Sequence, residues 1–265
     1  MRSTDRDSQS DPTIMTVKRG LEVLRAFQSV RTPLTNAELV RRTGLPKATV
    51  SRLTSTLMQV GFIKQVPGQR DFVLSTGALG IGSSYLSTSS ILKAANPLMQ
   101  ELADQLDVSV ALAVQDGIDM LYISYCVSRK VATLRLGVGL VLPMSTTAIG
   151  RAYLWGLSPA EQNQLLTAHK KRAKDRAEQL IKEIGASFNE LETTGTCSVL
   201  GGYQRNTYAV ALPVRIGRKK TLLGMSCGKA DVQPNLDAER MRIAPELKKT
   251  AKEIQVLLAD FDSQP

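Results

Sequence analysis

The chain of 265 residues is long enough for one large or two modest domains, and its 43% apolar residues can fill a buried core. It has 34 Lys and Arg residues against 24 Asp and Glu residues, and the net charge of +10 suggests nucleic acid or an anionic membrane surface as partner. No run approaches the roughly 18 apolar residues of a membrane span, and the polar start lacks the apolar segment of a signal peptide. We therefore expect a cytoplasmic protein without a membrane partner.

Cysteine and histidine are too few for most catalytic or metal-binding sites. Cys126, Cys197 and Cys227 lie far apart without a CxxC motif, which argues against a disulfide framework and indicates a reducing compartment. His169 is the only histidine, so a multi-histidine metal site is impossible and a Ser-His-Asp triad could form only around it. Because three basic residues follow His169, we expect it in a solvated loop. The sequence thus predicts no enzymatic activity, no metal and no cofactor.

The positive charge is concentrated at the front of the chain. Residues 1–75 contain 12 Lys and Arg residues and 6 Asp and Glu residues, whereas the rest of the chain carries a surplus of only four. Residues 1–13 are polar and almost devoid of apolar side chains, so we expect a disordered tail there. A nucleic-acid-binding domain is predicted to follow this tail.

A first helix is predicted from residue 14, because apolar residues recur at spacings of three and four. These residues are Val17, Leu21, Leu24 and Phe27. Pro33 ends the pattern, and Thr35 and Glu38 then form a capping box that opens a short second helix. Gly44 ends the second helix, since glycine tolerates the left-handed backbone of a C-terminal cap.

A third helix is predicted after Pro46, which suits the first position of a helix. Its apolar stripe comprises Val50, Leu53, Leu57 and Val60. The β-prone runs 62–66 and 71–74 flank a Pro-Gly turn and predict a hairpin. Three helices and a hairpin over residues 14–76 indicate a winged helix-turn-helix domain.

The face of the third helix opposite this stripe is basic, small and free of carboxylates, so it can enter the major groove of DNA. Arg52 can bind guanine bidentately, while Lys47 and Thr49 suit phosphate contacts. The hairpin tip would reach the DNA backbone or the minor groove. The full set of predicted DNA-contacting residues is Lys47, Ala48, Thr49, Ser51, Arg52, Ser55, Gln69 and Arg70. A solvated helix face in a protein-interaction domain is the other interpretation of this pattern.

Residues 77–92 are predicted to form a linker helix that also contributes to dimerisation, within a helical segment 76–106 that breaks near Pro97. Residues 93–262 then alternate strand and helix patterns. Predicted strands cover 108–115, 120–127, 131–136, 196–200, 207–215 and 221–227. Predicted helices cover 145–156, a segment opened by a capping box at Ser158, 172–184 and 236–258. This order predicts an α+β domain with a central antiparallel sheet of about six strands.

Ser145 and Thr146 precede a predicted helix whose free N-terminal amides can bind an anion. Simple capping of the helix by Ser145 would explain the same residues without a ligand.

Several segments together resemble the IclR-type (isocitrate lyase regulator) family of bacterial transcriptional regulators. They are TVKRGLEVLRAFQ, LTNAELVRRTGLPKATVSRLTSTLMQVGFI, LPMSTTAIGRAYL and NTYAVALPVRIGRKKTLLGMSCG. The resemblance covers about residues 14–258. It implies double-stranded DNA with a near-palindromic operator as partner, and a homodimer or a tetramer made of two dimers. It also implies a GAF-like effector-binding domain for a small organic acid of carbon catabolism.

Transferred to this sequence, the resemblance and the neighbouring apolar residues place the effector against eleven positions. These are Leu140, Leu142, Met144, Ser145, Thr146, Ala148, Ile149, Val199, Ala209, Met225 and Cys227. The chain departs from the family where an acidic run often precedes the closing strands, because residues 198–203 contain no carboxylate. We therefore expect a less polar pocket that favours a larger acid, aromatic acids included.

Two alternatives stay open at this point. The three cysteines could serve a redox sensor, although a free cysteine is also a common buried apolar residue. Alternatively, the protein could bind DNA constitutively, with a purely structural second domain.

Overall fold

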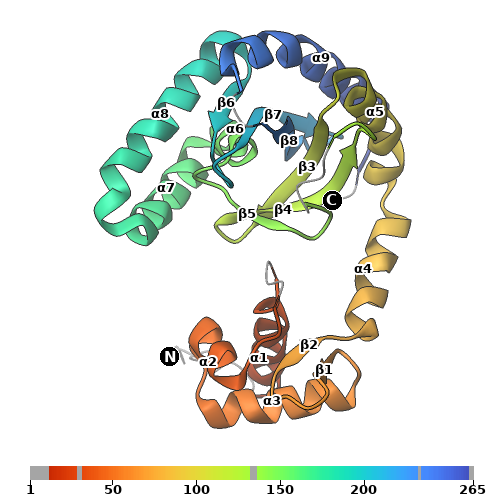
Figure 1. Ribbon diagram of the computed structural model, residues 1–265, viewed down its shortest axis with the longest axis vertical. Coiled ribbons are helices and arrows are strands. Elements are labelled where there is room, and N and C mark those ends of the chain that lie inside the picture. The colour runs from red at the N-terminus through yellow and green to blue at the C-terminus, as the bar shows by residue number, and fades with distance from the viewer. Residues whose placement is uncertain (1–11, 29–31, 132–135, 232–233, 263–265) are drawn as a thin grey trace, which may run out of the picture. The chain divides into compact units, whose positions relative to one another are not determined.

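The computed structural model describes residues 12–28, 32–131, 136–231 and 234–262 (Figure 1). Residues up to Thr88 form one compact unit, and residues from Ser89 onward form a second. Neither unit contains, in this part of the chain, a helix long and apolar enough to cross a membrane.

The first unit is a winged helix-turn-helix. Its elements are α1 (Pro12–Arg25), α2 (Asn36–Thr43), α3 (Lys47–Gln59), β1 (Ile63–Gln65), β2 (Phe72–Leu74) and α4 (Thr76–Thr88). Thr35 caps α2 through a hydrogen bond from the amide of Glu38, and Gly44 ends it in the left-handed conformation, as predicted. The strands β1 and β2 pair antiparallel, with Ile63 opposite Leu74. An isolated bridge between Leu34 and Phe72 joins the second strand to the segment before α2.

The core of this unit differs in two places from the predicted stripes. Val23 is buried in α1 and Phe27 is buried in the turn that follows it, whereas Val17 and Leu21 are 60% and 56% exposed. Helix α1 therefore turns the face of Gly20 and Val23 toward α3, since a side chain at Gly20 would meet Leu53. Val60, predicted to be buried, is exposed because it caps the C-terminus of α3 instead of continuing it.

The helical segment after the wing breaks at Ser89 and not at Pro97. The Ser89 side chain accepts a hydrogen bond from the amide of Leu92 and thereby caps the next helix, α5 (Ser90–Leu106). Pro97 lies within α5 on its exposed side, where water can bind the carbonyl that loses its amide partner. Helix α4 buries none of its side chains.

The second unit is an antiparallel sheet covered by helices on both faces. After α5 come β3 (Ser109–Asp116), β4 (Asp119–Val127), β5 (Val141–Pro143), α6 (Ala148–Gly156), α7 (Pro159–Ala173), the 3-10 turn Lys174–Arg176, α8 (Ala177–Thr194), β6 (Cys197–Leu200), β7 (Thr207–Ile216), β8 (Thr221–Ala230) and α9 (Leu236–Leu257). The strand order is β5-β4-β3-β8-β7-β6, which confirms the predicted six-stranded antiparallel sheet.

Each face of the sheet has its own apolar core. Helices α5 and α9 cover one face, where residues such as Val110, Val210 and Ile254 are fully buried (Figure 1). Helix α6 covers the other face, with α7 and α8 packed against it, around Ala113, Leu154 and Leu191. Successive residues on a central strand therefore belong alternately to one core and to the other.

Several predicted boundaries shift. The sixth strand of the sheet is β5, which lies in a predicted loop, while the predicted strand 131–136 falls largely outside the described residues. The predicted helix 172–184 corresponds to α8, which begins five residues later, because α7 continues through the basic run to Ala173. His169 therefore lies in a helix and is 1% exposed, which corrects the expected solvated loop.

Candidate DNA-binding surface and effector cavity

Helix α3 presents the predicted polar face to solvent. Val50, Thr54 and Leu57 bury the opposite face. The exposed residues are Lys47, Ala48, Ser51, Arg52 and Ser55, and Thr49 is half-buried at the edge of this face. Among the described residues, neither Lys47 nor Arg52 has an ion-pair partner, so both cations are available to a ligand.

The wing adds a second exposed polar group. Gln69 and Arg70 lie in the turn between β1 and β2, directly after Gly68, whose φ of 74° is the left-handed conformation that glycine adopts without strain. The Gln65 side chain donates to the Gln69 carbonyl at 2.8 Å and fixes the turn. The structure therefore leaves both predicted wing residues exposed at the tip of the hairpin.

The arginines of α2 are engaged within the protein. Arg41 and Arg42 both pair with Glu38, Arg42 at 3.5 Å. The hydrogen bond from Arg41 is the largest influence on the Glu38 carboxyl and holds its pKa below the usual value. Glu38 thus binds arginine in place of the predicted bond back to Thr35, and only half of that capping box forms. The cations of α3 and the wing are freer to bind phosphate.

A cavity of about 60 Å³ lies in the second unit between the sheet and the N-terminus of α6. Side chains or backbone from all six strands of the sheet form its walls. The lining residues are Ser109, Ala111, Tyr122, Tyr125, Leu136, Leu142, Thr147, Ala148, Ile149, Val199, Gly202, Tyr203, Thr207, Tyr208, Ala209, Ser226, Gly228 and Lys229. Five of the predicted effector-binding residues are among them, namely Leu142, Ala148, Ile149, Val199 and Ala209.

Met225 and Cys227 were assigned to the wrong face of the sheet. Both are fully buried in the core beneath α5 and α9, whereas Ser226 and Gly228, the alternate residues of β8, line the cavity. Successive side chains of a strand point to opposite faces, so Met225 and Cys227 cannot share the cavity face with Ser226 and Gly228. Strand β8 thus contributes the hydroxyl group of Ser226 to the cavity.

Four other predicted residues lie beside the cavity without lining it. Met144 is fully buried in the core around α6, and Leu140 packs against that core. Ser145 is buried, and its carbonyl accepts a hydrogen bond from Arg151 Nε at 2.9 Å. The Thr146 hydroxyl donates to the Gly202 carbonyl at 2.8 Å, which fastens the segment after β6 over the entry to α6.

The N-terminus of α6 supplies free amides, although its capping residue is Thr147 and not Ser145. The Thr147 hydroxyl accepts a hydrogen bond from the amide of Gly150 at 3.3 Å, and the Thr147 carbonyl accepts one from the backbone amide of Arg151 at 3.0 Å. The amides of Ala148 and Ile149 precede the first intrahelical bond, so they have no acceptor within the helix. Both residues line the cavity, which puts the positive end of the helix dipole against it.

Arg151, a residue that the sequence analysis did not single out, anchors this helix. Its side chain is 8% exposed and donates to the Glu183 carboxylate at 2.9 Å and to the Ser187 hydroxyl at 3.2 Å. With its bond to Ser145, Arg151 fixes α6 to α8 and to the segment before α6. The amides of α6 are therefore held rigidly toward the cavity.

Tyrosines dominate the remaining wall. Tyr122 and Tyr125 stack with ring centroids 6.1 Å apart and an interplanar angle of 19°. Burial raises the pKa of both hydroxyl groups, and hydrogen bonds to Ser226 and Ser109, respectively, partly oppose this shift. Both phenols are thus neutral hydrogen-bonding groups. Sequence reasoning missed these tyrosines, because residues three apart in a regular strand point to opposite faces. Only the β-bulge opposite Leu112 and Ala113 brings the two rings together.

Tyr208 and Lys229 contact the cavity from the backbone of paired strands. They are directly opposite each other on β7 and β8. Tyr208 belongs to the core under α9, and its hydroxyl donates to Glu239 at 2.6 Å. Since paired residues share a face, the Lys229 side chain also leaves on the α9 side. The side chains that face the cavity are therefore uncharged.

The cysteines do not have the features of a redox sensor. All three are buried, and burial raises the pKa of each thiol, so the reactive thiolate form is disfavoured. Val110 pairs with Cys126 on one neighbouring strand and with Cys227 on the other, so the width of a strand separates these two thiols. The described residues contain no group of His, Cys, Asp or Glu that could hold a metal ion.

Comparison with known proteins identifies the family of both domains. Residues 16–67 match the IclR helix-turn-helix domain, and residues 83–256 match the family model described as bacterial transcriptional regulator IclR C-terminal. The HTH-type transcriptional regulator TsaQ1/TsaQ2 of Comamonas testosteroni is 28% identical over 245 residues, which cover 91% of this chain and 87% of that protein. The Pca regulon regulatory protein of Pseudomonas putida is 29% identical over 207 residues, covering 77% and 70%.

The fold has solved counterparts as well. The crystal structure of an IclR family transcriptional regulator from Brucella abortus matches with a TM-score of 0.84 and 30% identity, covering 97% of this chain and 96% of that one. With the C-terminal model alone spanning more than half of the chain, the protein belongs to the IclR family of non-enzymatic transcriptional regulators, which join a DNA-binding helix-turn-helix domain to an effector-binding domain.

Proposed function

We propose that this protein regulates a carbon-catabolism operon by releasing or engaging its operator in response to a small organic acid, preferably an aromatic one. The observation that carries this proposal is the cavity, which is lined by Tyr122, Tyr125 and Tyr203 and by the first two residues of α6. Regulation then depends on the difference in effector affinity between two conformations of the protein and involves no chemical step.

The acid group would bind at the N-terminus of α6. The amides of Ala148 and Ile149 can donate two hydrogen bonds to a carboxylate, and the helix dipole favours the negative charge. No carboxylate side chain is among the described lining residues, so none of them repels an anion. The Ser226 hydroxyl can accept or donate a further bond on the opposite wall.

The remainder of the effector would lie against Tyr122 and Tyr125. Aromatic rings pack well against such a surface in stacked or edge-to-face geometry. The cavity of about 60 Å³ is smaller than the roughly 150 Å³ that holds a benzene molecule in an engineered protein cavity. Binding of an aromatic acid would therefore displace the wall, and Tyr203, which is 40% exposed, is the lining residue that can yield most easily.

The DNA-binding half would act as a dimer. Helix α4 exposes Leu79 and Ile81 at 71% and 62%, next to small residues that allow a second helix to approach closely. Helix α4 overlaps the predicted linker 77–92. Pairing of two chains through α4 would present two copies of α3 to the two half-sites of a near-palindromic operator. Two such dimers would form a tetramer.

Titration calorimetry with benzoate and 4-hydroxybenzoate against glyoxylate and pyruvate tests the effector class. We expect the aromatic acids to bind, and to change the affinity for an operator fragment selected from random DNA. Tight binding of glyoxylate or pyruvate alone would show that the small cavity is used without rearrangement. Unchanged operator affinity across a broad metabolite panel would favour constitutive DNA binding.

A further inference from the structure

Helix α8 supports two walls of the effector cavity with one of its sides. Glu183 and Ser187 bind Arg151 and thereby hold α6. Glu190, about one turn further along, binds the strand β6. These three residues of α8 follow each other at spacings of four and three, so they lie on the same side of the helix. The separation between α6 and β6 is therefore set by a single helix.

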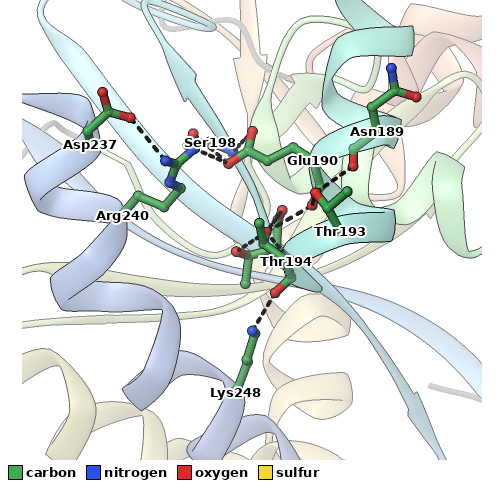
Figure 2. A network of polar contacts seen from close by, with 9 residues as sticks. Asn189, Glu190, Thr193, Thr194, Ser198, Asp237, Arg240 and Lys248 are labelled. Atoms are coloured by element: carbon green, nitrogen blue, oxygen red, sulfur yellow. Dashed lines mark hydrogen bonds and ion pairs between the residues drawn. The ribbon is translucent and has the colours of Figure 1, made fainter.

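The Glu190 carboxylate binds the outer edge of the sheet (Figure 2). Its Oε2 accepts a hydrogen bond from the Ser198 amide at 3.0 Å, and its Oε1 accepts one from the Ser198 hydroxyl at 2.9 Å. Because β6 is the outermost strand of the described sheet, the amide that bonds to Glu190 has no strand partner. A side chain of α8 thus takes the place of a neighbouring strand.

Arg240 of α9 completes this contact from the other face of the sheet. It binds Glu190 Oε1 at 3.4 Å and Asp237 at 3.1 Å (Figure 2). The Glu190 side chain is 18% exposed, whereas that of Asp237 is 78% exposed, so Glu190 is the carboxylate held within the protein. Helices α8 and α9 are therefore joined across the edge of the sheet at Ser198.

The residues on both sides of Ser198 belong to the wall next to the N-terminus of α6. Val199 lines the cavity together with Ala148 and Ile149. The Sγ atom of Cys197 lies 3.4 Å from the Ala148 carbonyl oxygen. Neighbouring residues of a strand point to opposite faces, so Ser198 can bind Glu190 while Cys197 and Val199 face α6. A bond that fixes Ser198 therefore also fixes this wall.

We propose that Glu190 is a positioning residue that limits the size of the acid that the effector site accepts. The cavity of about 60 Å³ must widen to admit an aromatic acid. Arg151 holds α6, and Glu190 holds β6 at Ser198, so the widening is confined to the segment 201–206, which contains Tyr203. We expect room for one aromatic ring and exclusion of two fused rings. The inference rests on the proposed function and adds a size limit to it.

Titration calorimetry of the full-length chain with benzoate and 2-naphthoate tests this limit. The wild type should bind benzoate about 100-fold more tightly than 2-naphthoate, since a larger group overpacks a fixed wall. Glu190→Ala should reduce this ratio about tenfold, because β6 is then free to move outward. Glu190→Gln should keep the ratio within about twofold of the wild type, since its amide oxygen still accepts a bond from Ser198.

The ratio of the two affinities separates positioning from stability. A variant that is only less stable lowers the fraction of binding-competent protein, which weakens the binding of both acids by the same factor. Glu192→Ala, a change at an exposed residue of the same helix, is the control and should keep the wild-type ratio. Ser198→Ala is a milder variant for use if Glu190→Ala does not fold. It removes one of the two bonds to β6 and should reduce the ratio about fourfold.

The outcomes distinguish this inference from the proposed function. Glu190→Ala and Ser198→Ala variants that keep the wild-type ratio, or lose affinity for both acids equally, would overturn the size limit and leave the proposed effector class intact. Equal binding of the two acids by the wild type would do the same. A wild type that binds neither acid would overturn the effector class, and the size limit with it.

Discussion

Gly150 is the position where a single methyl group should disable the effector site. A Cβ atom there would lie 2.1 Å from the Met144 carbonyl oxygen and 2.4 Å from the Met144 Cα. Both neighbours are backbone atoms, so no side-chain rotation can relieve the overlap. Replacing glycine by alanine in a helix normally gains about 1 kcal/mol. The overlap should outweigh that gain and leave the Gly150→Ala variant about 1–3 kcal/mol less stable.

The structure provides a matched control on another helix. At Gly185 in α8, no atom lies within 4 Å of an added Cβ. The Gly185→Ala variant should therefore be as stable as the wild type or more stable by up to about 1 kcal/mol. Urea denaturation followed by circular dichroism compares the two variants, and calorimetry with 4-hydroxybenzoate compares their binding.

We expect Gly150→Ala to lose both stability and effector binding, because α6 must move away from Met144 and carry the amides of Ala148 and Ile149 with it. DNA affinity in the absence of effector should be unchanged, since the winged helix belongs to the other compact unit of the chain. A Gly150→Ala variant with the stability and effector affinity of Gly185→Ala would refute the assignment of the α6 N-terminus as the acid-binding site.

Three further predictions concern other parts of the molecule. Arg52→Ala should relax sequence preference at one operator position by about 1–3 kcal/mol. Arg70→Ala should weaken binding to all sequences alike and lower the slope of log affinity against log salt concentration by about one. Identical effects of the two variants in a binding titration over operator sequence variants would contradict this prediction. Burial lowers the pKa of His169, so the unfolded state binds its proton first and stability should fall as the pH drops from about 7 to 5. Because this is the only histidine, His169→Gln should flatten that dependence in urea titrations, and an unchanged slope would mean that other groups cause it. Arg151→Met should lower the free energy of unfolding by about 1–3 kcal/mol, less than the loss of a fully buried ion pair would, because Glu183 is 37% exposed. An unchanged free energy of unfolding in the same assay would show that α6 is held mainly by apolar packing.

Features set by neighbouring residues were predictable from the sequence. The caps at Thr35 and Ser158 depend on residues three positions apart, and the capping box of Ser158 and Glu161 forms in full. The wing and the antiparallel pairing of β7 with β8 follow from β-prone runs around a turn. The order of these local elements along the chain then predicted the α+β architecture.

Features that depend on which helix covers which surface were not predictable in this way. Met225 and Ser226 alternate on β8, and the local pattern does not tell which one meets α6. In α1, both Val17 and Val23 suit an apolar face, and only packing against α3 selects Val23. The strand β5 has three residues and exists because its backbone pairs with β4, with Met120 opposite Leu142.

In the proposed dimer, the bare surface of α4 would make the folding of this helix depend on assembly. This helix has 13 residues, contains Gly80 and Gly82, and buries no side chain of its own. Isolated helices shorter than about 12–15 residues are marginal in water even when rich in alanine. Helical structure in the linker and association of the proposed dimer would therefore form one equilibrium. Dilution should melt α4 and expose it to proteases, so that the concentration of the protein sets how firmly its two units are joined.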